Sequence, residues 1–276
     1  MKRDTTLSEV IGDGGLAFEG RPVLTCRDLR ASHGDEILFE GLNFEILGGE
    51  IVALIVESEW SARLVPRIAI GVETQDEGEM ELLGTIHHDL SERQRLALRH
   101  MVGYLFHNSG LIHNLTVWYN VALPALYHSR FTDIEGVSER VEPLIDRCHL
   151  REFCHLRPAE LDEASRKRVA LARAWAMMPP FLILEDPLMD IDSSSGSELL
   201  DLAFGSTPPE WIGRDPRPAN PGVLITSQGL HEGLFRYVDR LIIIDQGRVV
   251  FNENPREYDR RGMIHSTDIL EQKEAS

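Results

Sequence analysis

The chain has 276 residues, of which 42% are hydrophobic and 26% are charged, so it can bury a full core as one large domain or as a domain with a subdomain. Its formal net charge of −17, from 28 basic and 45 acidic residues, disfavours nonspecific binding to nucleic acid or to anionic lipid. The N-terminus lacks an apolar signal core, and no apolar stretch is long enough to span a bilayer. We therefore expect a cytoplasmic protein that reaches the inner face of a membrane only through a partner.

Short apolar runs predict strands, after a polar, glycine-rich lead-in at residues 1–20 that we expect to be flexible. The run 51–56 is continuously apolar, which is typical of a strand that is buried on both faces of a parallel sheet. Three later runs share this pattern. The predicted strands are residues 22–28, 37–39, 42–46, 51–56, 80–83, 102–106, 181–184, 223–226, 241–244 and 249–251.

Helical segments separate most of these runs, at residues 63–70, 91–99, 137–148, 158–178 and 231–238. The alternation predicts an α/β fold with a mostly parallel sheet that is covered on both faces. The last two strands form a predicted hairpin with Gly247 in its turn. We expect one domain at residues 21–255 with a helical insertion at about 85–165, an exposed loop at 205–222, and a tail at 256–276.

The cysteines are three in number, Cys26, Cys148 and Cys154, and an odd, sparse set argues for a reducing compartment without disulfides. Two Cys-His pairs, at 148–149 and 154–155, raise the alternative of a metal site. Their spacing fits no ordinary zinc pattern. We therefore expect structural cysteines and no bound metal.

Three motifs in a fixed order carry a family resemblance. They are GVETQDEGEM at 71–80 followed by Gly84, VALARA at 169–174, and DRLIIIDQGRV at 239–249. From about residue 22 to residue 255 the chain resembles the ATP-binding-cassette ATPases of ABC transporters. The resemblance implies a P-loop NTPase-like cassette with a mostly parallel central sheet, an antiparallel β subdomain and a helical insertion. It also implies a cassette dimer, with a second copy or with another cassette.

One segment narrows the resemblance. Residues 105–121 read LFHNSGLIHNLTVWYNV, and Leu123-Pro124 follow. This segment is similar to the ATPases of bacterial phospholipid-trafficking transporters, which work with a binding protein of the mammalian-cell-entry type. The resemblance implies that the region from Leu105 to Pro124 docks a membrane permease subunit, and it implies no nucleic-acid partner.

The loop that should hold the nucleotide phosphates has lost its phosphate-binding residues. By alignment to the family, Val56, Glu59 and Ser61 stand at the three glycine positions. Ala62 stands at the lysine position, and Arg63 stands at the position of the hydroxyl that binds Mg²⁺. Glycines allow the backbone to curl around phosphates, and lysine neutralises them. Substituted in this way, the loop is predicted to hold no nucleotide.

The other nucleotide-contacting positions also depart from the family pattern. His33 falls at the adenine-stacking position and His107 at the glutamine that senses Mg²⁺. The signature that binds a partner's γ-phosphate reads Asp162, Glu163 and Ala164 in place of small residues. Two acids repel phosphate there, but acids at a helix start also cap the helix and favour its dipole. We expect the capping role.

The catalytic carboxylates stand in reversed order, as Glu185 and then Asp186 after the strand 181–184. The family places Asp first, for Mg²⁺, and then Glu, for the attacking water. The switch histidine falls on Ser227, which cannot carry a positive charge. Together these losses predict a pseudo-ATPase that needs no cofactor and acts as a structural or regulatory partner of a permease. Two alternatives remain open: an atypical MgATP-binding ATPase that uses Arg63 with the two carboxylates, and a soluble adaptor unrelated to transport.

Overall fold

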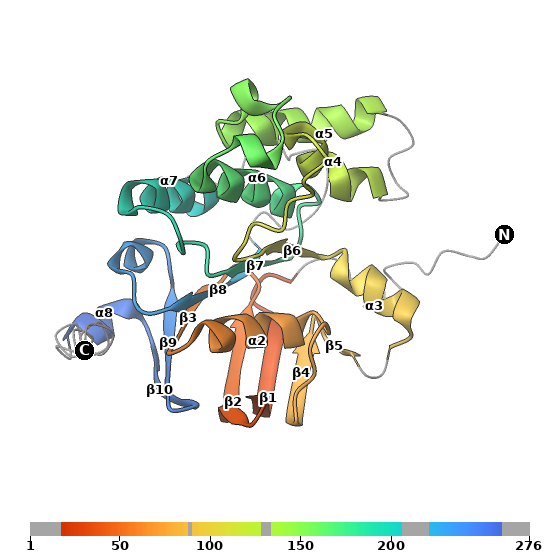
Figure 1. Cartoon of the computed structure of the whole chain (residues 1–276). Helices are drawn as coiled ribbons and strands as arrows, with labels where there is room; N and C mark the ends of the chain where they lie inside the picture. The colour runs from red at the N-terminus through yellow and green to blue at the C-terminus, as the bar shows by residue number, and fades with distance from the viewer. Residues whose placement is uncertain (1–17, 88–89, 128–133, 206–220, 261–276) are drawn as a thin grey trace.

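A six-stranded sheet runs through the middle of the molecule in the computed structural model, which describes residues 18–87, 90–127, 134–205 and 221–260 (Figure 1). Every neighbouring pair of its strands is parallel except β9 and β10, so the predicted mostly parallel sheet is confirmed. In spatial order the strands are β10 (Arg248–Glu253), β9 (Arg240–Asp245), β3 (Ile51–Val56), β8 (Gly222–Gln228), β7 (Phe181–Glu185) and β6 (Val102–Leu105).

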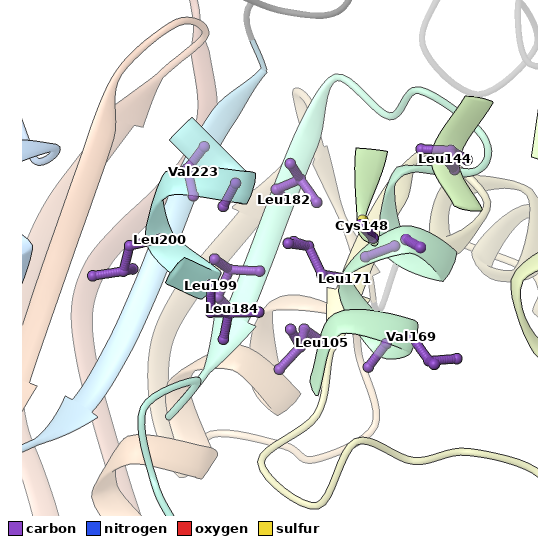
Figure 2. Packing of buried hydrophobic residues seen from close by; sticks show 14 of the residues in the cluster. Leu105, Leu144, Cys148, Val169, Leu171, Leu182, Leu184, Leu199, Leu200 and Val223 are labelled. Carbon is purple, nitrogen blue, oxygen red and sulfur yellow. The ribbon is translucent and has the colours of Figure 1, made fainter. Parts of the chain in front are cut away.

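The central strands are continuously apolar because both faces of the sheet are buried. On β7, Leu182 and Leu184 pack into the cluster on the helical side, as Figure 2 shows, whereas Phe181 and Ile183 pack into the cluster on the other side. Side chains alternate between the two faces of a strand, so each face needs its own apolar set. The sequence pattern and the fold therefore have the same cause.

The predicted antiparallel β subdomain is a four-stranded sheet in the order β2-β1-β4-β5. Its strands are β1 (Pro22–His33), β2 (Glu36–Leu47), β4 (Glu77–Leu82) and β5 (Thr85–Ile86). The runs predicted separately at 37–39 and 42–46 are one strand, and the register between β1 and β2 shifts around Gly41, whose φ is 72°. A bulge of this kind breaks the alternating pattern without ending the strand, which is why the sequence suggested two strands.

Helices cover the six-stranded sheet on one face, and the four-stranded sheet lies with α2 on the other (Figure 1). The helices are α2 (Glu59–Ala69), α3 (Glu92–Arg99), α4 (Val117–Tyr127), α5 (Ile134–Arg147), α6 (Glu163–Trp175), α7 (Ser193–Phe204) and α8 (Pro255–Arg260). Single 3₁₀ turns lie at η2 (Arg151–Phe153), η3 (Pro158–Glu160) and η5 (Glu232–Arg236). No helix among the described residues is long and apolar enough to cross a membrane.

Several predicted helices have different bounds in the structure. The segment 158–178 divides into η3 and α6 because Asp162 caps a new helix start, and 231–238 forms only the 3₁₀ turn η5. Helices α4 and α7 were not predicted. Helix α4 contains aromatic residues, two valines and Pro124, which are weak helix formers, and burial of one side of the helix outweighs that preference.

The closing hairpin has the predicted turn. Gln246 and Gly247 both have positive φ, at 49° and 73°, as the two central residues of a type I′ turn require. The lead-in up to residue 17, the loop at 206–220 and the tail after residue 260 lie outside the described residues, as do residues 88–89 of the predicted insertion.

Candidate functional site

The candidate site lies at the carboxyl edge of the six-stranded sheet, where the loops after four parallel strands meet. Glu185 is the last residue of β7, Asp186 follows it, and Ser227 lies beside them on β8. His107 follows β6, and helix α2 follows β3. Ligands of open α/β sheets bind at this edge. The structure therefore brings together residues that the sequence separates by well over a hundred positions.

The junction between β3 and α2 holds a helix start in place of a phosphate loop. Only Glu57 and Ser58 separate the strand from the helix, which begins at Glu59. The Ser58 side chain caps the helix by accepting from the Ser61 N–H at 3.1 Å, and the Ser58 carbonyl accepts from the Ala62 N–H at 3.0 Å. The backbone N–H groups of Ser61 and Ala62, two of those that would cradle a phosphate, are thus bonded inside the helix start.

The two glutamates of this junction have partners of their own. Glu57 accepts from the backbone N–H of Gln246 in the closing hairpin, at 3.0 Å. Glu59 forms an ion pair with Arg63 one helical turn later. These contacts tie the junction to the hairpin and to α2, and both carboxylates still place negative charge near the position of the phosphates.

Glu185 lies at the centre of a buried polar cluster. Its side chain is 0% exposed, and its carboxylate lies 3.9 Å from Arg63 Nε and 3.6 Å from Arg67 Nη2. The carboxylate also accepts from the Tyr104 hydroxyl and lies 2.7 Å from His107 Nδ1. Burial beside Glu185 raises the pKa of Tyr104, which keeps its hydroxyl a donor. Two guanidinium groups from α2 therefore lie where the resemblance implies Mg²⁺ and phosphate.

Asp186 and Ser227 form a second contact behind Glu185. Burial raises the pKa of the Asp186 carboxyl, and Lys167 and the hydrogen bond from Ser227 offset only part of that effect. The Ser227 hydroxyl lies 3.5 Å from Asp186 Oδ1. The backbone of Asp186 also has a φ of 43°, a conformation that residues other than glycine rarely adopt.

The predicted adenine position is occupied from within the chain. The ring of His33 stacks on the ring of Trp60, with the centroids 3.8 Å apart and the planes 18° from parallel. Trp60 comes from the first turn of α2, and Arg63 lies 5.8 Å from the centre of its ring. An adenine ring that stacked on this face of His33 would have to displace the indole.

The residues at the signature position form the start of α6. The Asp162 side chain caps the helix by accepting from the Ser165 N–H at 2.7 Å, and this bonding lowers the pKa of Asp162. Glu163 pairs with Arg166 at 3.0 Å, and Ala164 follows in the first turn. Asp162 thus has the capping role expected of these acids, whereas Glu163 is the first residue of the helix.

A cleft of about 430 Å³ opens between α2, the residues after β6, the start of α6 and the loop after β7. Its charged lining residues alternate in sign: Glu59, Arg63, Glu163, Arg166 and Asp190. Because Arg63 and Arg166 are already paired with carboxylates, the cleft offers no uncompensated cation for a polyanion.

The sequence indicated most of these residues but not their partners. Tyr104 and Trp60 were missed as parts of the site, although both are aromatic residues next to predicted site positions. Lys167 was missed as well: it is 0% exposed on α6 and donates to the backbone carbonyls of His107 and Asp186. A lysine in the otherwise apolar stripe of an amphipathic helix is the signal that could have found it.

The two Cys-His pairs do not form a metal centre. Cys148 is buried in the core, where burial raises the pKa of its thiol to about 12, and His149 contacts Glu198. Among the residues that the structure describes, no three His, Cys, Asp or Glu side chains lie together in a way that could hold an ion.

Comparisons with known proteins identify the family. The model of the ABC transporter family matches residues 39–189. The chain belongs to this family, as a transporter cassette. The solved structures that it resembles include CbiO1 from Clostridium perfringens, part of the ABC transporter complex CbiONQ, with a TM-score of 0.71, 20% identity, and coverage of 92% of this chain and 99% of that one. The dimeric ABC transporter cassette MJ0796 also has a TM-score of 0.71, with 22% identity over 84% of this chain and 98% of that one.

Curated relatives come from several transport systems. The chloroplast protein TRIGALACTOSYLDIACYLGLYCEROL 3 of Arabidopsis thaliana is 26% identical over 88% of this chain and 72% of its own length. The lipoprotein-releasing system ATP-binding protein LolD of Pseudomonas fluorescens is 28% identical over 83% of this chain and 98% of its own length. The sulfate/thiosulfate import ATP-binding protein of Cucumis sativus is 28% identical over 84% of this chain, and the chain spans 62% of that relative.

Proposed function

We propose that this chain is a pseudo-ATPase cassette, which binds no MgATP and serves as a structural or regulatory partner of a membrane permease in a lipid-transport system. The observation that carries the proposal is the pairing of Glu185 with Arg63 and Arg67. Each oxygen of this fully buried carboxylate already has a hydrogen-bonding partner in the chain, and two guanidinium groups lie beside it, which disfavours a Mg²⁺ ion there.

Two other replacements point the same way. Trp60 covers His33 at the adenine position, and the helix start at Ser58 engages the N–H groups of Ser61 and Ala62. Each replacement supplies from within the chain a contact that a nucleotide would otherwise make. The charged groups Glu59, Arg63 and Glu185 thus have partners within the chain, which favours a site that needs no ligand.

The region from Leu105 to Pro124, the docking segment, is well formed in contrast. Asn120 is fully buried, accepts from the Ile112 N–H at 2.8 Å, and donates to backbone carbonyls including that of Ile112 at 3.1 Å. Ile112 and Tyr119 remain 40% and 47% exposed. Exposed apolar side chains on a rigid segment favour protein binding, and the family assigns this contact to a permease. Through that permease the chain would sit on the inner face of the membrane.

The lipid assignment rests on the phospholipid-trafficking pattern of residues 105–121 and on two relatives. The printed names of those relatives refer to trigalactosyldiacylglycerol and to lipoprotein release. Sulfate importers are similar to the same degree, so overall identity does not select a substrate.

Calorimetry tests the loss of nucleotide binding. Titration of the purified chain with MgATP to millimolar concentration should give no binding heat, whereas a competent cassette run in parallel should give a stoichiometric signal. Saturable heat of one site per chain would overturn the proposal.

A second candidate is an atypical ATPase, which the proximity of Arg63 to Glu185 favours. In that case MgATP turnover would be measurable, and Glu185→Ala or Asp186→Ala would abolish it. Absence of turnover in the unmodified chain, measured beside the competent cassette, removes this candidate.

Purification from detergent-solubilised native membranes, followed by mass spectrometry, tests the partner. A permease should co-purify with the unmodified chain and be lost with Tyr119→Asp. The matched control is Val250→Asp on β10, whose side chain is 55% exposed in the hairpin away from the docking segment. Recovery of soluble proteins alone would favour the adaptor and end the transporter assignment.

A further inference from the structure

Helix α6 sends two cationic side chains to the start of the docking segment, one buried and one partly buried. Lys167 is 0% exposed, and its ammonium group donates to the carbonyl of His107 and, at 3.4 Å, to that of Asp186. Arg173 donates to the carbonyls of Ser109 and Gly110, at 2.8 and 2.7 Å. Three of the four residues from 107 to 110 thus have their carbonyls bonded to one helix.

These contacts fix the positions of the bonded carbonyl groups, because the two cationic side chains have few other acceptors. Burial lowers the pKa of Lys167, although Glu163 and Asp186 are near enough to oppose the shift. Burial also lowers the pKa of Arg173 to about 10, with no nearby acid to oppose it. A buried cation is tolerated only when its donors are satisfied, so both side chains require the carbonyls to stay in place.

The segment that they hold has a backbone that would not persist by itself. Ser109 and Gly110 have φ values of 62° and 54°, two left-handed residues in succession. Serine adopts that conformation only where surrounding contacts impose it. The contacts that hold it are those from α6, including the hydrogen bond from the Ser109 hydroxyl to Glu163 at 3.4 Å, and local bonds from the Ser109 and Gly110 N–H groups to Phe106 O and Asn108 O, both at 2.8 Å.

His107 is held at both ends. Its ring contacts Glu185 in the filled nucleotide site, and its carbonyl accepts from Lys167. The carbonyl of Asp186 accepts from the same ammonium group. Lys167 therefore joins the ends of β6 and β7 to α6 at the point where the docking segment leaves the sheet.

We propose that Lys167 and Arg173 form an internal clamp that keeps residues 107–113 in one docking-competent conformation without any nucleotide, with Lys167 as the principal positioning residue. The functional consequence rests on the proposed role of the docking segment in binding a permease. The clamp itself follows from contacts within the chain. A cassette built in this way would present the same surface to its partner at every stage of a transport cycle.

Hydrogen exchange measured by mass spectrometry tests the clamp in the full chain. The N–H groups of Ser109 and Ile112 are hydrogen-bonded to Phe106 O and Asn120 Oδ1, both at 2.8 Å, and serve as reporters. In Lys167→Met, which keeps an unbranched apolar stem, exchange in 107–113 should rise by about tenfold while exchange in the closing hairpin stays unchanged. Exchange within about twofold of the unmodified chain would overturn the clamp.

Two further variants keep the result interpretable. Leu24→Ala creates a cavity in the four-stranded sheet, remote from α6, and should not speed exchange in 107–113 selectively, which separates a local clamp from a general loss of stability. If Lys167→Met fails to fold, Arg173→Lys is used, because it keeps the charge but loses one of the two carbonyl contacts, and a smaller selective increase is expected. No selective increase in Arg173→Lys would then overturn the clamp.

Addition of MgATP separates this inference from the proposed function. If the clamp holds, millimolar MgATP should leave exchange in 107–113 of the unmodified chain unchanged, and a nucleotide-dependent change would overturn the clamp's independence of ligand. Binding heat without such a change would overturn the pseudo-ATPase assignment and leave the clamp standing. Unaltered exchange in Lys167→Met together with an absence of binding heat would overturn the clamp alone.

Discussion

The β3–α2 junction and the docking segment lie at the same edge of the sheet, and they differ in what their polar groups do. In the junction, Arg63 and Arg67 approach a buried carboxylate and a helix start replaces a phosphate loop. At the docking segment, polar groups hold the backbone: Asn120 bonds to main-chain atoms, and Lys167 on α6 donates to two backbone carbonyls. In the junction, the charged groups are paired with one another. At the docking segment, the polar groups fix the conformation of the backbone.

The difference shows that the fold does not depend on the phosphate loop. The two hydrophobic clusters use the apolar strands and the helix faces, and residues such as Leu54 and Leu184 pack there whatever follows the strand. A loop that binds a ligand adds little to such a core, so its residues can change while the cassette persists. The contrast between the β3–α2 junction and the docking segment is stronger if experiment shows that the junction stabilises the protein rather than serving catalysis.

Substitution of Glu185 is expected to have the largest effect on stability. Glu185→Ala should lower the free energy of unfolding by about 3–5 kcal/mol, because it leaves two partly buried guanidinium groups and a buried hydroxyl without their acceptor. Denaturant unfolding measures it. Glu185→Gln, which keeps an acceptor but loses the charge, should cost less. A loss below about 1 kcal/mol for Glu185→Ala would mean that the cluster is not structural.

More of the fold than of the candidate site could be predicted from the sequence. Continuous apolar runs such as 181–184 predicted the parallel sheet, because burial on both faces has a direct compositional signature. The position of Glu185 at the carboxyl end of this strand was predicted for the same reason. Its pairing with Arg67 was not, because a helix contact across three strands depends on where α2 begins, and α2 begins four residues before the predicted start. The role of Lys167 was not predicted because its hydrogen-bond acceptors are backbone carbonyls, which every residue has and which residue types therefore do not indicate.

A smaller effect is expected at the adenine position. Trp60→Ala should cost about 1 kcal/mol, since a stacked aromatic pair contributes on that scale and the indole is 46% exposed. It should not create nucleotide binding, because the helix start at Ser58 remains. Thermal unfolding and MgATP calorimetry on the same sample check both statements. Appearance of binding heat would show that the indole alone had kept the nucleotide out, and it would narrow the contrast between the two regions.

The smallest predicted change is a gain in stability. Burial raises the pKa of Asp186 above its unfolded value, so the ionised carboxylate is less favourable in the folded state. Asp186→Asn should therefore stabilise the protein at pH 7, by on the order of 1 kcal/mol, because asparagine carries no charge to bury. Asparagine also tolerates the positive φ of this position better than most residues.

The difference in stability between Asp186→Asn and the unmodified protein should change with pH in a direction set by the raised pKa. As the pH falls through the raised folded-state pKa towards the unfolded value, the unmodified carboxyl becomes protonated in the folded protein and the advantage of asparagine shrinks. Asp192, which caps α7, is the control of opposite sign, because hydrogen bonds lower its pKa and Asp192→Asn should lose stability at neutral pH. Unfolding curves for both variants at pH 7 and in mild acid are compared. A less stable Asp186→Asn at pH 7 would mean that the ionised carboxylate still has a role in the fold.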